Sequence, residues 1–140
     1  MTETPAPDIG VIMVPVDMEE KERSGGALAM AARLARNFSA KLYVMTAAHP
    51  LGDDVAEYPE HHKPEFQNFI DKVAKTYRIG VEPLFRSHAS PEKMILDTAE
   101  EVKADLIVMA THDPKFADRF FGSHASHIAL RAHCSVMAVR

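Results

Sequence analysis

A polar stretch near the C-terminal end of the chain contains the residue types that bind phosphate. Ala110-Thr-His-Asp113 follows an apolar segment, and Gly122-Ser-His-Ala-Ser126 begins a helical pattern. Glycine lets a backbone approach an anion, serine hydroxyls donate, and the amides of a first helical turn lack intrahelical partners. Lys115 and Arg119 lie between the two segments and can neutralise phosphate. The stretch predicts a phosphate site; the alternative is an ordinary Gly-Ser helix start with solvated charges.

A second polar position follows the first apolar run of the chain, at Pro15-Val16-Asp17. A carboxylate after a buried strand can hold a ribose or a Mg²⁺ ion. It can equally cap a turn by accepting a backbone N–H. The residue alone does not decide between these two roles.

Several histidines near the C-terminal end raise the alternative of a metal site. His124 and His127 stand three residues apart, with His133 and Cys134 close by in sequence. No CxxC or HExxH spacing occurs, and His133 lies beyond the helical face of the other two. Solvated histidines are therefore the favoured interpretation.

Ser123, His112 and Asp17 together suggest a serine hydrolase. The sequence around Ser123 is Gly-Ser-His-Ala, which lacks the G-x-S-x-G pattern of a nucleophile elbow. A nucleophilic serine is therefore not expected.

The elements that must position these residues alternate between strand and helix. Five apolar runs predict strands, at Gly10–Val16, Leu42–Ala47, Val81–Arg86, Asp105–Ala110 and Val136–Val139. Four stretches predict helices, at Gly26–Phe38, from Phe66 to an end at Gly80, from the N-cap Ser90, and from Gly122. Alternation of this kind requires a parallel sheet, because each crossover returns over a sheet face. The fold class is α/β, and ligands of such sheets bind beyond the carboxyl ends of the strands.

Two shorter signals refine this arrangement. Pro83 removes a ladder donor from the third strand, which favours an edge position. The segment Glu19–Arg23 alternates in charge and is expected to form a solvated turn.

Composition limits the class of protein. The 140 residues are 46% apolar and carry a net charge of −4, which predicts one domain over residues 1–140 without a basic surface for nucleic acid. No run is long enough for a membrane helix, the first ten residues do not resemble a leader, and Cys134 is the only cysteine. We expect a cytoplasmic protein in which residues 1–9 are disordered.

At this point the sequence resembles the universal stress protein family over almost its whole length. The segments that carry the resemblance are Ile12–Asp17, Ala89–Pro91, Asp105–His112, Arg119–Ser123 and Cys134–Arg140. The resemblance implies a five-stranded, parallel, doubly wound sheet of order 3-2-1-4-5, Rossmann-like and similar to the adenine nucleotide alpha hydrolases. Strands one and four would then be neighbours, which brings Asp17 to the phosphate stretch.

The details around Asp113 separate this chain from the standard nucleotide motif of the family. Ala110 and Asp113 stand at the glycine positions, and only the eight residues 114–121 precede Gly122. A strict interpretation places the chain among members that do not bind ATP. The Thr-His-Asp-Pro sequence with a short loop instead resembles the F/G type, whose Ser-His-x-Pro loop also serves nucleotide binding. Asp113 would repel phosphate unless Mg²⁺ or Lys115 offset its charge.

The resemblance implies a regulatory or protective module of the stress response that binds ATP or a related adenine nucleotide such as ADP or AMP, with Mg²⁺ held by Asp17. Its implied nucleotide-binding residues are Pro15, Val16, Asp17, Thr46, Ala110, Thr111, His112, Asp113, Lys115, Arg119, Gly122, Ser123, His124, Ala125 and Ser126. Two alternatives remain: an interaction protein of the same fold with an empty site, and a slow Mg²⁺-dependent ATPase.

The last strand predicts self-association. Val136–Val139 is apolar, and no later element follows to cover it. An uncovered strand at a sheet edge exposes unpaired amides and carbonyls, and a twofold pairing of two copies would satisfy them. We expect a homodimer through residues 136–140, and the resemblance implies the same arrangement.

Overall fold

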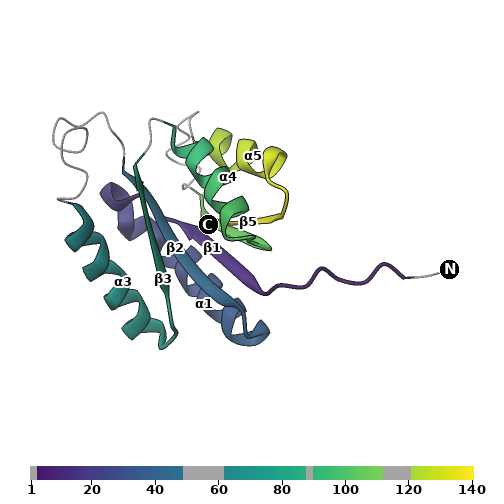
Figure 1. Ribbon diagram of the computed structural model, residues 1–140, viewed down its shortest axis with the longest axis horizontal. Helices are drawn as coiled ribbons and strands as arrows, with labels where there is room; N and C mark the ends of the chain where they lie inside the picture. The colour runs from purple at the N-terminus through teal and green to yellow at the C-terminus, as the bar shows by residue number, and fades with distance from the viewer. Residues whose placement is uncertain (1–2, 49–61, 88–89, 112–120) are drawn as a thin grey trace.

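In the computed structural model, which describes residues 3–48, 62–87, 90–111 and 121–140, one parallel sheet has helices on both faces (Figure 1). The strands are β1 (Val11–Pro15), β2 (Lys41–Ala48), β3 (Glu82–Ser87), β4 (Leu106–Ala110) and β5 (Ser135–Val139). Their order across the sheet is β3-β2-β1-β4-β5, and all four pairings are parallel. The predicted α/β class, parallel sheet and strand order are therefore confirmed.

The helices divide between the two faces of the sheet. They are the 3₁₀ helix η1 (Met18–Ser24) and the α-helices α1 (Gly25–Phe38), α3 (Lys63–Tyr77), α4 (Pro91–Glu101) and α5 (Phe121–Arg131). α1 and α3 cover one face, and α4 and α5 cover the other (Figure 1). Among the described residues, no helix combines the length and apolar character needed to cross a membrane.

Side-chain alternation along each strand builds two separate cores. On β1, Ile12 and Val14 point to the α1/α3 face, whereas Met13 points to the α4/α5 face, and all three are fully buried. On β4, Val108 and Ile107 divide in the same way. Strands buried on both faces lose the polar half of the usual alternation. This burial explains why their sequences are continuous apolar runs.

The order of the strands places the edges where the sequence predicted them. β3 is an edge strand, and Pro83 pairs in register with Val44 on its inner side. β5 is the other edge and pairs with β4 alone among the described residues. In the part of the chain that the structure describes, β3 and β5 therefore each have one unpaired side.

Two local predictions are wrong in detail. α3 ends at Arg78, which adopts φ 52 and donates its backbone N–H to the Ala74 carbonyl, so Gly80 does not end the helix. Gly80 has no positive φ. The predicted turn at Glu19–Arg23 lies within the 3₁₀ helix η1, which Asp17 caps.

Asp105 fastens the N-terminal part of the chain to β4. Its Oδ2 accepts hydrogen bonds from the backbone N–H groups of Gly10 and Val11, each at 2.9 Å. Residues 3–10, before this contact, form neither helix nor strand. The carboxylate therefore marks the point at which the chain enters the sheet.

Candidate functional site

The reversal of strand order between β1 and β4 creates the candidate site. β1 connects outward to β2 on one side, and β4 connects to β5 on the other, so the segments that follow β1 and β4 diverge at one edge. Crevices of this kind at the carboxyl edge of a doubly wound sheet are where ligands bind. The predicted groups at 15–17 and 110–111 are therefore brought to the same edge.

The segment after β1 is held in place by its own backbone. The Val16 N–H donates to the Met45 carbonyl oxygen at 2.8 Å, which continues the β1–β2 pairing beyond the strand end. Asp17 is exposed, and its Oδ1 accepts the Glu19 N–H at 3.0 Å as the N-cap of η1. The capping role weighed from the sequence is thus present. It uses one carboxylate oxygen, and no other described residue donates to Oδ2.

Thr46 lies in β2 beside this segment. It follows Met45, whose register partner is Pro15, and its side chain is only 3% exposed. By strand alternation with Val44 it points to the α1/α3 face, the face on which Val16 is buried. Val16 and Thr46 are thus both buried close to the carboxyl ends of β1 and β2.

Ala110 and Thr111 continue from β4, and Thr111 has a structural role. Its backbone N–H donates to the Val139 carbonyl oxygen at 2.8 Å, and its Oγ1 donates to the same oxygen at 3.2 Å. Both groups hold the end of β4 against the end of β5. Ala110 is half-buried against the α1/α3 core.

The predicted phosphate-binding stretch is described only in its second half. His112, Asp113, Lys115 and Arg119 lie outside the described residues. α5 begins at Phe121, so the backbone of Gly122, Ser123 and His124 forms its first turn, as expected. Amides at such a position have no intrahelical acceptor and favour anions. Ala125, the next residue, is half-buried, and Ser126 is exposed. Ser126 also takes part in a polar or electrostatic interaction with another residue.

The start of α1 approaches the same edge, which the sequence did not reveal. A Cβ built on Gly26 would lie 3.4 Å from the Arg140 carbonyl oxygen and 3.5 Å from Val139 Cγ1. These are ordinary van der Waals distances, so the start of α1 packs closely against the end of β5 although the two segments are far apart in sequence.

Two of the described histidines, one in α5 and one just after it, lie beside carboxylates of α4. His127 Nδ1 lies 3.3 Å from Glu92 Oε1, and His133 Nε2 lies 3.1 Å from Glu100 Oε1. Within the described part of the chain, no three metal-ligating side chains cluster. The side chain of His124 lies outside the described residues, so the preference for solvated histidines over ligands stays a prediction.

The described residues could bind Mg²⁺ only together with the phosphates of a bound nucleotide. Mg²⁺ usually binds one or two carboxylates together with substrate phosphates and waters. Asp17 provides one exposed carboxylate at the crevice, with Oδ1 occupied by Glu19. The residue can therefore supply a single ligand.

A comparison of the sequence with models of known protein families identifies the family of this chain. The model of the universal stress protein family matches residues 9–140. The chain belongs to this family. Universal stress protein G of Shigella flexneri is 27% identical over 139 residues, which cover 92% of this chain and 97% of that protein. The resemblance to the F/G type drawn from the sequence is confirmed by this relative.

Solved universal stress proteins share the architecture. The universal stress protein of Archaeoglobus fulgidus in complex with dAMP superposes with a TM-score of 0.71 at 25% identity, covering 95% of this chain and 99% of that one. A universal stress protein in complex with cAMP gives a TM-score of 0.72 at 24% identity, covering 95% and 98%. The doubly wound fold is common to all three chains.

Proposed function

We propose that this chain binds ATP or a related adenine nucleotide at the carboxyl edge between β1 and β4, and that it works as a regulatory or protective module of the stress response in the cytoplasm. The observation that supports the proposal is that Pro15–Asp17 and the end of β4 follow neighbouring parallel strands, with the first turn of α5 next along the chain after β4. The dAMP complex of the Archaeoglobus fulgidus relative supports it.

Each part of the crevice suits one part of a nucleotide. The amides of the first turn of α5 and the Gly122 backbone are suited to phosphate, because a helix start carries partial positive charge. The exposed Asp17 carboxylate is suited to a ribose hydroxyl or to a phosphate-bound Mg²⁺. The buried side chains of Val16 and Thr46 are suited to pack beneath the apolar face of a base.

The test is a melting measurement with ATP, ADP, AMP and dAMP, each with and without Mg²⁺. A ligand that binds only the folded state stabilises it by about 2.7 kcal/mol at a hundred times its Kd. Mass spectrometry of the nucleotide that copurifies names the ligand independently. No melting shift with any of the four, and no copurifying nucleotide, would favour an interaction protein with an empty site.

A turnover assay separates binding from hydrolysis. The described residues at the crevice include no side chain placed as a general base toward phosphate, so bound nucleotide is expected to act by shifting conformation or assembly. Release of inorganic phosphate over many cycles per site would instead support the slow Mg²⁺-dependent ATPase.

We also propose a homodimer through β5. The Ser135 N–H donates to the Asp105 carbonyl oxygen, and the Val139 carbonyl oxygen accepts from Thr111, so these odd-numbered residues bond inward to β4. The backbone groups of Val136 and Ala138 then point to the open edge. Antiparallel pairing of two such edges satisfies them in a closed, twofold assembly.

Ala138→Pro tests the dimer with little cost to the subunit. Proline at position 138 removes an outward N–H and no bond to β4, and proline is tolerated on edge strands. Light scattering should report a dimer for the wild type and a monomer for the variant. Leu130→Lys is the matched control, because Leu130 is 82% exposed on α5, outside the strand. A monomeric wild type at micromolar concentration would end the proposal.

A further inference from the structure

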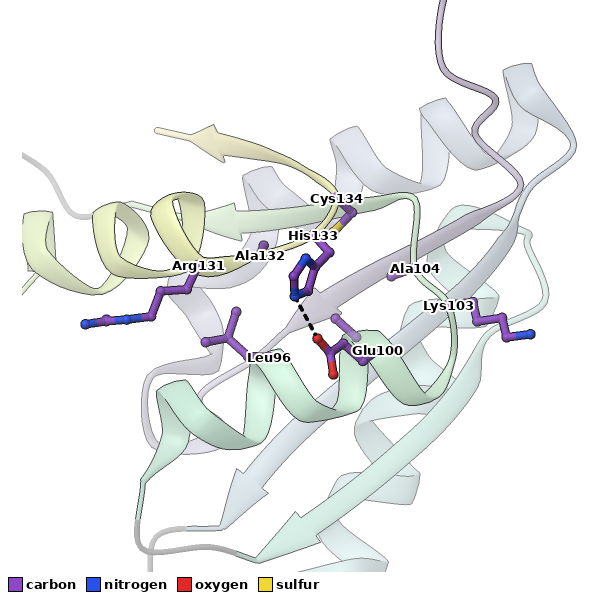
Figure 2. A pocket seen from close by; sticks show the side chains of 9 residues that line it. Leu96, Glu100, Lys103, Ala104, Arg131, Ala132, His133 and Cys134 are labelled. Carbon is purple, nitrogen blue, oxygen red and sulfur yellow. Dashed lines mark ion pairs between the residues drawn. The ribbon is translucent and has the colours of Figure 1, made fainter.

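A hollow lies near the amino ends of the strands, at the opposite end of the sheet from the proposed nucleotide site. It has a volume of about 330 Å³ and lies where the C-terminal ends of α4 and α5 meet the start of β5 (Figure 2). Its position places it beside the amino ends of β4 and β5, whereas the crevice lies beyond their carboxyl ends. A ligand here would not compete with the nucleotide for space.

Small side chains create the hollow. Ala99, Ala104 and Ala132 line it together with Leu96, at positions where larger residues would close the seam between the two helices. The turn after α4 is fixed by a backbone hydrogen bond, in which the Ala104 N–H donates to the Ala99 carbonyl oxygen at 2.9 Å. The Ala132 N–H donates to the Ile128 carbonyl oxygen at 2.8 Å in α5. These bonds fix the backbone at the C-terminal end of each helix, where the alanines line the hollow.

The charged groups around the hollow leave its interior uncharged. His133 and Glu100 pair with each other at 3.1 Å. Lys103 and Arg131 extend to opposite sides, away from this pair (Figure 2). Arg131 belongs to the last turn of α5, where a cation offsets the partial negative charge of the helix end, and Lys103 follows the C-cap of α4. Burial raises the pKa of the Cys134 thiol in the same lining, which reports a weakly solvating environment.

We propose that this hollow is a binding site for a small, uncharged, largely apolar molecule. Its volume lies at the lower end of the range for small-molecule pockets, roughly 300–1,000 Å³. Alanine, leucine and thiol groups favour an apolar body, while the paired His133 and Glu100 offer a donor or acceptor for one neutral polar group at the mouth. A charged ligand would lose its hydration and gain no unpaired counter-charge inside.

The test uses three probes with the same ring and different charge: benzyl alcohol, benzoate and benzylamine. Cys134 is the only cysteine of the chain and lines the hollow, so its alkylation by iodoacetamide reports occupancy. Benzyl alcohol should slow the alkylation in a saturable manner. Benzoate and benzylamine should need about tenfold higher concentrations or more, because desolvating a full charge is costly. Equal or stronger protection by either ion, or no protection by benzyl alcohol, would overturn the proposal.

Ala132→Leu fills the hollow and should abolish protection by benzyl alcohol. Ala129→Leu is the matched control, since Ala129 is exposed on the same helix and does not line the hollow. NMR of the alanine methyl groups in the wild type gives a readout that needs no variant. Shifts confined to Ala99, Ala104 and Ala132 on adding benzyl alcohol support the site, and shifts elsewhere without these contradict it.

Discussion

Removing the Asp105 carboxylate should detach the N-terminal segment from the sheet and destabilise the whole chain. Its Oδ2 accepts two backbone N–H groups, one of them partly buried at Val11 and one exposed at Gly10. A hydrogen bond to a charged group contributes about 1.5–3 kcal/mol, and less when exposed. We expect Asp105→Ala to lower the free energy of unfolding by about 2–4 kcal/mol.

The melting temperature converts this into a measurable shift. At about 2.1 cal/mol/K of unfolding entropy per residue, the melting temperature of a chain of 140 residues falls by about 3.4 °C for each kcal/mol of lost stability. Asp105→Ala should therefore melt about 7–14 °C lower. Asp105→Asn should cost only about 1 kcal/mol, because both bonds go to one oxygen and an amide carbonyl can accept both.

Asp97→Ala is the matched control. Its carboxylate is half exposed and pairs with Lys93 within α4, a contact that contributes less than about 0.5 kcal/mol. Amide hydrogen exchange gives a local readout, in which Gly10 and Val11 lose protection in Asp105→Ala. A variant that melts with the wild type and keeps this protection would refute the reasoning.

The other predictions concern the crevice, a helix cap and the thiol. Gly122→Val should abolish nucleotide binding measured by calorimetry, whereas Gly80→Val, with open space around it, should bind as the wild type does; equal binding by both would remove Gly122 from the site. Asp17→Asn keeps the cap oxygen and should lose mainly the Mg²⁺ dependence, and an unchanged Mg²⁺ titration would leave Asp17 as a cap alone. Ser90→Ala loses the bond from the Lys93 N–H and should cost about 1 kcal/mol in chemical denaturation; no change would deny the cap a role. Because burial raises the pKa of Cys134, the folded state holds the thiol proton more tightly, so stability should fall as pH rises through the thiol's ordinary range, and Cys134→Ala should remove that fall.

The strands could be predicted because burial on both faces leaves a continuous apolar run. Pro83 added the edge position of β3, since a missing amide is tolerated only where no neighbour needs it. Helix ends were harder to predict. Ser39, Arg78 and Lys103 all adopt positive φ just beyond helices, where glycine is the usual signal. Tertiary packing imposes these conformations, and no local pattern in the sequence reports them.

The sequence proposed residues for the site, and it did not predict the contacts between the segments around it. The sequence indicated Asp17 and the start of α5, because polar residues after buried strands are conspicuous. It did not show that Thr111 bonds to Val139, or that Gly26 lies against the Arg140 carbonyl. Both contacts join segments that only the strand order brings together. The family resemblance supplied that order, which periodicity alone did not provide.

The pairing of β1 with β4 has a consequence for synthesis on the ribosome. The contact between Gly10 and Asp105 spans 95 residues, so the centre of the sheet stays open until most of the chain has been made. At about 5–20 residues per second, this delay lasts on the order of 5–20 s. For most of that time α4 has not been made, and α5 follows only after Asp105, so the face that contains Met13 and Met45, both fully buried in the finished protein, lacks its covering helices. We therefore expect the nascent chain to expose at this face the kind of apolar surface that chaperones bind, which the finished sheet covers with α4 and α5.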